Sequence, residues 1–183
     1  HLHIMETDRL YHFFWDEPAY AERFDQLLTE CERAVRQFAD LARQRNATLV
    51  LLSDLGFTRC QRIVFINALL EKTGLLRFSS PDRTLETMDP HSSAFALAPG
   101  RIFLRAASDA QRNELRSQLV ALFMDIRDPV TGECPFEEIG AREELYHGPH
   151  IHKSADLVLL PKPGYDLKAD FDADKVFETP SVL

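Results

Sequence analysis

The chain has 183 residues, of which 45% are hydrophobic and 27% charged. At about 150 residues per domain, this length predicts a single domain over residues 1–183 that buries roughly 70% of its unfolded surface. The composition excludes disordered, collagen-like and disulfide-stapled chains. With 29 acidic against 21 basic residues, the net charge of −8 disfavours a nucleic-acid polymer as a partner, although a bound metal would admit a small anionic substrate.

The apolar runs and the cysteines of the chain indicate its cellular location. No stretch reaches the roughly 20 apolar residues of a membrane span, so no membrane partner is expected. The odd number and wide spacing of Cys31, Cys60 and Cys134 predict reduced thiols in the cytoplasm. The chain opens on strand-like alternation without an initiator methionine or a signal peptide, and it ends on the apolar residues 181–183. We therefore expect residues to be missing at both ends.

The first 53 residues predict a strand–helix–strand unit. Residues 1–7 alternate like a strand, and Asp16-Glu17-Pro18 is typical of a helix start. The continuous apolar run 48–53 predicts a buried parallel strand, joined to the first by a right-handed crossover. The helix between them is predicted from apolar residues that recur every three or four positions: Phe24, Leu27, Leu28, Cys31, Val35, Phe38, Leu41 and Ala42.

The remaining elements are shorter. A helix over 65–72 is stopped by Gly74, and two strands near 95–97 and 101–104 flank a Pro-Gly turn. Ser108 or Asp109 caps a helix with an apolar face, residues 128–132 form a turn, and 156–161 form a buried strand. The pattern of residues 137–146 is ambiguous. The fold class is therefore α/β, with a helix-flanked sheet of mixed strand directions.

Two aspartates follow the two predicted parallel strands. Asp8 ends the first strand and Asp54 ends the second. Ligands gather at the carboxyl ends of parallel strands, so we expect both carboxylates at one edge of the sheet. Asp54 is also compatible with an ordinary strand-to-loop turn.

His12 lies four residues after Asp8. If residues 9–13 form a helical turn, the carboxylate and the imidazole face the same way, and together they suit Zn²⁺, Mn²⁺ or iron. The alternative is that Asp8 caps the turn and His12 is a half-buried structural histidine. The pair alone does not decide between these interpretations.

Several ordered segments together resemble the alkaline phosphatase superfamily. The closest resemblance is to the type I phosphodiesterase/nucleotide pyrophosphatase branch and its phosphohydrolase/phosphomutase-like group, and it covers nearly the whole chain. The segments that carry it are Thr7 to Trp15 (TDRLYHFFW), Leu52 to Phe57 (LSDLGF), Ile66 to Leu76, Gly100 to Leu104 (GRIFL), Asp128 to Glu133, Arg142 to Pro149 and Ala155 to Val158.

The resemblance implies an alkaline-phosphatase-like fold, here a partial domain, with a two-metal site that usually holds zinc. Asp8 and His12 would bind one metal and Asp54 part of the other. Two cations a few ångströms apart activate the attacking oxygen and neutralise the leaving oxygen. Position 55 departs from the family, because Leu55 stands where a metal-ligating histidine is found. The family's nucleophile segment and its late histidine are not among these residues, so this polypeptide alone is not expected to complete a catalytic cycle.

We expect structural roles for the other reactive or aromatic residues. His147, His150 and His152 fall in a Gly-Pro loop, where histidines bind metal mainly adventitiously. Cys60 has no local activating pattern, and we expect a small buried residue rather than a nucleophile. The aromatic residues of 13–15 are expected in a core rather than as a base-stacking platform.

Two functions from different classes remain open. One is a metal-dependent phosphohydrolase or phosphodiesterase acting on small phosphate esters such as nucleotides. The other is a degenerate, non-catalytic homologue that acts as a binding or interaction domain, which the loss of a ligand histidine at Leu55 would suit.

Overall fold

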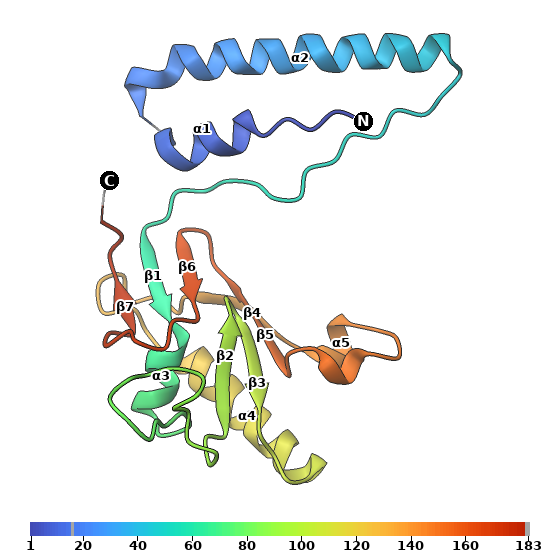
Figure 1. The fold of residues 1–183 in the computed structure, drawn as a ribbon. Coiled ribbons are helices and arrows are strands. Elements are labelled where there is room, and N and C mark those ends of the chain that lie inside the picture. The colour runs from blue at the N-terminus through green and yellow to red at the C-terminus, as the bar shows by residue number, and fades with distance from the viewer. Residues whose placement is uncertain (16, 182–183) are drawn as a thin grey trace. The chain divides into compact units, whose positions relative to one another are not determined.

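The computed structural model describes residues 1–15 and 17–181 and divides into two compact units, His1–Arg59 and Cys60–Leu183 (Figure 1). The first unit is helical, and the second holds both β-sheets. Asp16 and residues 182–183 lie outside the described residues. The part of the expected helix start that rests on Asp16 therefore also lies outside them. The single domain over 1–183 stays a prediction.

The long amphipathic helix of the first unit is confirmed. The unit contains α1 (Glu6–Phe14), the short 3-10 helix η1 (Pro18–Tyr20) and α2 (Ala21–Gln44). After α2 the chain turns at Asn46, which has a φ of 48°, and the Ala47 amide donates to the Ala42 carbonyl at 2.9 Å. This pattern satisfies the last carbonyls of a helix. None of the described residues in the first unit is buried.

The two strands expected in the first unit are absent from the structure. Residues 1–5 and 47–59 belong to no helix or strand, so the predictions of strands over 1–7 and 48–53, and of their parallel pairing, are wrong. Residues 6–14 satisfy their backbone groups within a helix instead, and an apolar run forms a strand only where a neighbouring strand accepts its hydrogen bonds. Leu51 and Leu52 are 66% and 91% exposed.

The second unit contains a mixed sheet and an antiparallel sheet. In the three-stranded sheet β1 pairs in parallel with β6 and antiparallel with β7, and in the four-stranded sheet the order is β2-β3-β5-β4. The predicted α/β class with mixed strand directions is confirmed. The strands are β1 (Arg62–Phe65), β2 (Ala94–Ala98), β3 (Arg101–Leu104), β4 (Phe136–Ala141), β5 (Leu157–Pro161), β6 (Tyr165–Lys168) and β7 (Phe177–Glu178).

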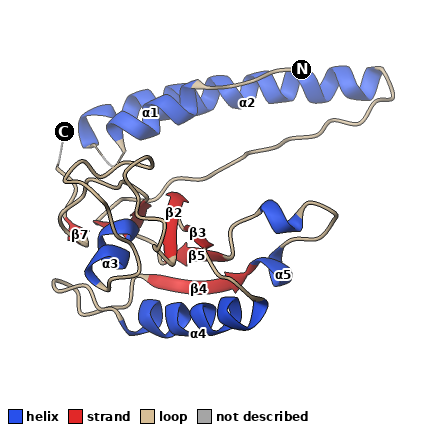
Figure 2. Cartoon of the chain, turned by 60° about the horizontal axis from the view of Figure 1, so that its bottom comes forward, coloured by secondary structure: helices blue, strands red, loops and turns tan. Residues whose placement is uncertain are grey.

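The helices of this unit are α3 (Ile66–Lys72), α4 (Asp109–Asp125), α5 (Arg142–Leu145) and the 3-10 helix η2 (Ile151–Lys153). Figure 2 shows α4 lying along β4. As predicted, Ser108 caps α4, because its hydroxyl accepts a hydrogen bond from the Gln111 amide at 3.2 Å. Three residues on one face of α4 are buried in the core: Leu115, Leu119 and Phe123.

One buried side chain and one glycine hold the β2–β3 hairpin in place. The Asn67 amide group donates to the Ala96 and Ala169 carbonyls at 2.9 and 2.7 Å and accepts from the Ala96 amide at 2.8 Å. Asn67 therefore satisfies backbone groups on the open edge of β2. Gly100 turns the hairpin at a φ of +64°, and a Cβ there would lie 2.5 Å from the Leu159 carbonyl oxygen.

Two buried carboxylates are paired with arginines. The Arg62 Nε and Nη2 atoms donate to both oxygens of Asp128 at 2.7 and 3.1 Å, and Asp128 has no exposed surface. Asp156 pairs with Arg112 at 2.5 Å and with Arg142 at 3.3 Å. These pairs join β1 to the 128–132 turn and α4 to the start of β5. No helix in the described part of the chain is long and apolar enough to cross a membrane.

Candidate functional site

The helix α1 brings two of the predicted ligands together. Asp8 and His12 lie one turn apart, and the His12 Nε2 atom is 3.5 Å from the Asp8 Oδ1 atom. Both side chains reach solvent, with 46% of Asp8 and 61% of His12 exposed. Residues 9–13 are helical, so the condition under which positions 8 and 12 share one face is met. The half-buried histidine of the alternative interpretation is not found.

Asp54 lies in an exposed turn of the same unit. The Ser53 hydroxyl donates to the Leu55 carbonyl at 2.5 Å, which closes a tight turn around Asp54. The expectation that Asp8 and Asp54 follow parallel strands at one sheet edge is wrong, because neither segment is a strand. Among the described residues, no three His, Cys, Asp or Glu side chains are grouped to hold a metal ion. The metal role of Asp8, His12 and Asp54 thus stays a prediction.

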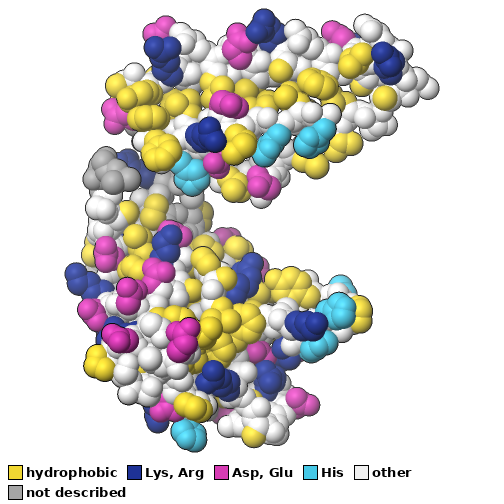
Figure 3. Space-filling model, viewed as in Figure 1, with side chains coloured by type: hydrophobic (Ala, Val, Ile, Leu, Met, Phe, Trp, Pro, Cys, Tyr) yellow, Lys and Arg dark blue, Asp and Glu magenta, His cyan; other side chains and the backbone are white. Residues whose placement is uncertain are grey.

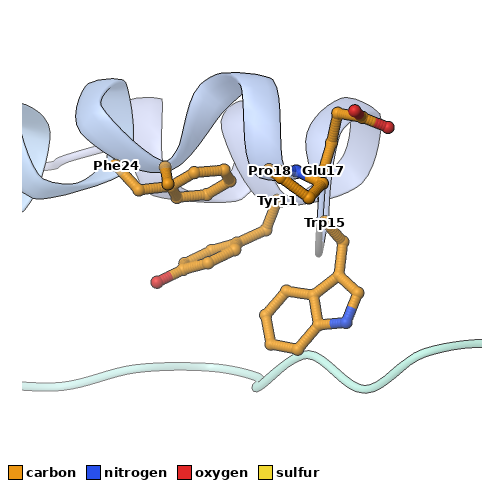
Figure 4. Close-up of a pocket in the computed structure, with 6 residues that line it drawn as sticks. Tyr11, Trp15, Glu17, Pro18 and Phe24 are labelled. Atoms are coloured by element: carbon orange, nitrogen blue, oxygen red, sulfur yellow. The ribbon is translucent and has the colours of Figure 1, made fainter.

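An aromatic hollow of about 520 Å³ lies between α1 and the start of α2 (Figure 4). The ring of Tyr11 is centred 5.1 Å from that of Trp15 and 4.9 Å from that of Phe24. The residues that line the hollow are Tyr11, Trp15, Glu17, Pro18, Ala21 and Phe24.

Phe57 connects the hollow to the Asp8–His12 pair. Its ring lies 4.9 Å from the His12 ring in an edge-on arrangement and 5.3 Å from the Tyr11 ring. The imidazole, which is also 3.5 Å from Asp8, is thus held between a carboxylate and an aromatic ring. These contacts place the donor atoms of the pair beside an open, mainly apolar surface.

The sequence pattern did not indicate this hollow, and the aromatic residues of 13–15 were expected in a core. Phe13 is 72% and Trp15 41% exposed, and none of the described residues of this unit is buried. The spacing of Tyr11 and Trp15 carried a usable signal, because residues four apart share one face of a helix. The ring contacts of Phe57 with Tyr11 and His12 depend on the path of the chain after α2, which the sequence pattern did not predict.

A family model for type I phosphodiesterase / nucleotide pyrophosphatase matches residues 1–180. The chain belongs to this family. It is therefore a member of a family of phosphodiesterase- and pyrophosphatase-type hydrolases, as the resemblance of its motifs predicted. No curated protein and no solved structure matches the chain.

Phosphodiesterases of this family generally use divalent metals, and the donor set on α1 fits such an ion in part. One carboxylate oxygen and one imidazole nitrogen are ligands that zinc and similar ions accept, and the two atoms lie 3.5 Å apart. Leu55, which is 52% exposed, supplies no donor beside Asp54. The described residues thus offer two grouped ligands and one separate carboxylate.

The other reactive groups among the described residues form no comparable site. The rings of His150 and of His152 in η2 are 6.3 Å apart and exposed, and they form no three-ligand group with other described side chains. At Cys60, desolvation and the charge of Asp166 raise the thiol pKa, which disfavours the nucleophilic thiolate. The expectation that Cys60 is buried is wrong, since the residue is exposed.

Proposed function

We propose that Asp8 and His12 are two ligands of a divalent metal in a phosphodiesterase-type hydrolase that acts on small phosphate esters. The observation that carries the proposal is their pairing at 3.5 Å on one face of α1, in a chain of a family that generally uses such metals. Zinc suits this mixed oxygen and nitrogen donor set best. Asp54 would contribute to a second metal.

The chemistry required is hydrolysis of a P–O ester bond by water. A bound divalent ion lowers the pKa of water and neutralises charge on the phosphoryl oxygens. The Asp8 Oδ1 atom and the His12 Nε2 atom lie on the same side of the pair and would both face the ion. The Phe57 ring contacts the His12 ring edge-on and limits its rotation. Phe57 therefore helps to orient one of the two proposed ligands.

The hollow beside the pair supports an ester that carries an aromatic group, such as a nucleotide. Tyr11, Trp15 and Phe24 offer ring faces at a spacing that suits contact with a flat ligand. The net charge of −8 disfavours a long polyanion, so a small ester is the better substrate. A cytoplasmic location is part of the proposal, since Cys31, Cys60 and Cys134 are all free thiols.

Metal binding is tested by calorimetric titration of the full chain with Zn²⁺ and Mn²⁺. His12→Ala and Asp8→Asn should each weaken zinc binding about tenfold or more, because each removes one ligand. The matched controls are His3→Ala and Glu6→Gln, which change the same residue types near α1 and should leave the affinity unchanged. Equal zinc affinity in His12→Ala and in the parent chain would refute the proposed ligand set.

The aromatic hollow is tested by binding of adenosine monophosphate and of ribose 5-phosphate. Trp15→Ala should weaken binding of the nucleotide but not of the sugar phosphate, since only the nucleotide has a ring to pack against Tyr11 and Phe24. Phe13→Ala is the matched control, because this exposed aromatic residue does not line the hollow. Equal losses for both ligands would assign Trp15 a structural role.

A non-catalytic binding domain is the second candidate function, and Leu55 favours it. An inactive site loses ligands, and leucine cannot coordinate a metal. Leu55→His should raise the zinc affinity if the site has lost only this ligand. Because Leu55 is half exposed, the substitution should leave the melting temperature nearly unchanged. Unchanged zinc binding at unchanged stability would favour the binding domain.

A further inference from the structure

The helix α2 carries an apolar stripe that its own unit leaves partly open. The stripe residues alternate at spacings of four and three, which is the heptad pattern of a helix-pairing seam. No residue of α2 is buried, and Leu28 and Phe38 are 46% and 36% exposed. Figure 3 shows hydrophobic side chains running along the helices of this unit. The α2 stripe consists of Phe24, Leu28, Cys31, Val35, Phe38 and Ala42.

Charge is distributed unevenly along the same helix. Residues 22–32 contain four acidic residues and one basic residue, whereas residues 33–45 contain four basic residues and one acidic residue. A second α2 helix in the same direction would place like charges beside one another. A second helix in the opposite direction would place each acidic half beside a basic half.

We propose that α2 pairs with α2 of a second copy of this chain in an antiparallel, two-fold symmetric contact. A two-fold axis makes the contact self-complementary, because the same stripe faces itself. Placing the axis at the middle of the stripe sets Leu28 against Phe38 and Cys31 against Val35 of the second copy. Phe24 lies at the end of the stripe, where its ring packs against Tyr11 of its own chain and lines the hollow.

The association is tested by light scattering and sedimentation equilibrium of the full 183-residue chain. The parent chain should be a dimer whose dissociation constant rises about tenfold or more in Leu28→Glu/Phe38→Glu, because both substitutions place charges at the centre of the seam. The matched control, Thr29→Glu/Gln37→Glu, adds the same charges one residue away on the outer face and should leave the dimer intact. Circular dichroism checks that both variants keep their helix content.

The direction of pairing is tested by oxidative cross-linking in a Cys60→Ser/Cys134→Ser background. Antiparallel pairing brings Cys31 opposite Val35, so Val35→Cys should give a cross-linked dimer. Val35→Cys/Cys31→Ser should lose most of this product. In parallel pairing Cys31 faces itself, so cross-linking in the background without Val35→Cys would overturn the antiparallel arrangement.

Three further results would overturn the proposal. A parent chain that stays monomeric at high concentration would show that α2 does not pair with itself. Equal weakening by the Leu28/Phe38 and Thr29/Gln37 variants would place the contact elsewhere. A monomer that sediments with vesicles of phosphatidylcholine and phosphatidylserine would identify a lipid surface as the occupant of the stripe.

Discussion

The Asp128 carboxylate shows how a single buried charge connects distant parts of the chain. Two Arg62 nitrogens donate to its oxygens, the Val130 amide donates at 2.9 Å, and the Gly132 amide donates to its backbone carbonyl at 2.8 Å. Arg62 also hydrogen-bonds Thr179 near the other end of the unit. The motif at 128–132, which the sequence predicted only as a turn, is therefore the partner of a buried arginine. Removing either charge leaves the other without compensation.

Asp128→Asn should lower the free energy of unfolding by about 3 kcal/mol at neutral pH, because it leaves the Arg62 charge uncompensated. The exposed Asp172→Asn is the matched control and should stay within about 0.5 kcal/mol of the parent. Urea denaturation at pH 7 measures both. A small effect of Asp128→Asn would mean that water replaces the lost ionic contact.

Low pH should also remove the stabilisation that the Asp128–Arg62 pair provides. Burial raises the pKa of Asp128. The hydrogen bonds from Arg62 and Val130 and the charge of Arg62 together lower the pKa by more than burial raises it, so the net pKa falls below the ordinary 3.8. The ionised pair therefore stabilises the fold fully above the unfolded-state pKa, and this stability is lost as the pH falls through the folded-state pKa. Urea denaturation of the parent and Asp128→Asn from pH 7 to pH 2.5 should show their difference shrinking below about pH 4. A difference that stays constant would contradict the linkage.

The helices α2 and α4 show that a helical pattern does not determine burial. Both were predicted from apolar residues at spacings of three and four. In α4 this face enters the core, where Phe123 has no exposed surface and packs against Phe136 at a ring distance of 5.4 Å. In α2 the corresponding residue Phe38 is 36% exposed, so the same spacing here does not bury the side chain.

Phe123→Ala should therefore cost about 3–5 kcal/mol of unfolding free energy, whereas Phe38→Ala should cost less than about 1 kcal/mol in the monomer. The loss at Phe123 combines removed apolar contacts with a cavity. Denaturation at low protein concentration, monitored by circular dichroism, gives both values. Equal losses at the two positions would mean that Phe38 is covered in solution.

Local signals predicted several elements of the second unit, although they did not predict β1, β6 or β7. The Pro-Gly turn, the Ser108 cap and the apolar run at 156–161 correspond to β2–β3, α4 and β5. The strands predicted at 1–7 and 48–53 failed because strand formation depends on a partner elsewhere, which periodicity does not reveal. The Asp8–His12 pair was predictable because it depends only on spacing within a helix. Contacts made by Phe57 and the buried partner of Asp128 depend on the tertiary path of the chain.

At the scale of the whole molecule, burial is concentrated in one of the two units. All buried residues among those described lie in the second unit, between Arg62 and Leu167. A unit without buried residues gains little stability from removing apolar surface from water. The second unit therefore accounts for the cooperative part of the fold.

Residues 60–183 produced alone should unfold cooperatively with nearly the melting temperature of the full chain. Hydrogen exchange should be slow in β1 and α3, whose residues are largely buried, and fast over residues 47–59, which form no helix or strand. Calorimetry and exchange mass spectrometry measure the two effects. A large drop in melting temperature would show that residues 1–59 stabilise the second unit.

The exposed segment from Leu49 to Leu52 has a consequence for handling the protein. Four consecutive apolar residues without charge, proline or glycine are typical of segments that stack into cross-β fibrils when their backbone groups are free. Arg45 and Asp54 lie on either side of the segment and act as charged interruptions of such stacking. Storage at high salt would screen these charges, so fibril formation nucleated at this segment should become faster as the ionic strength rises.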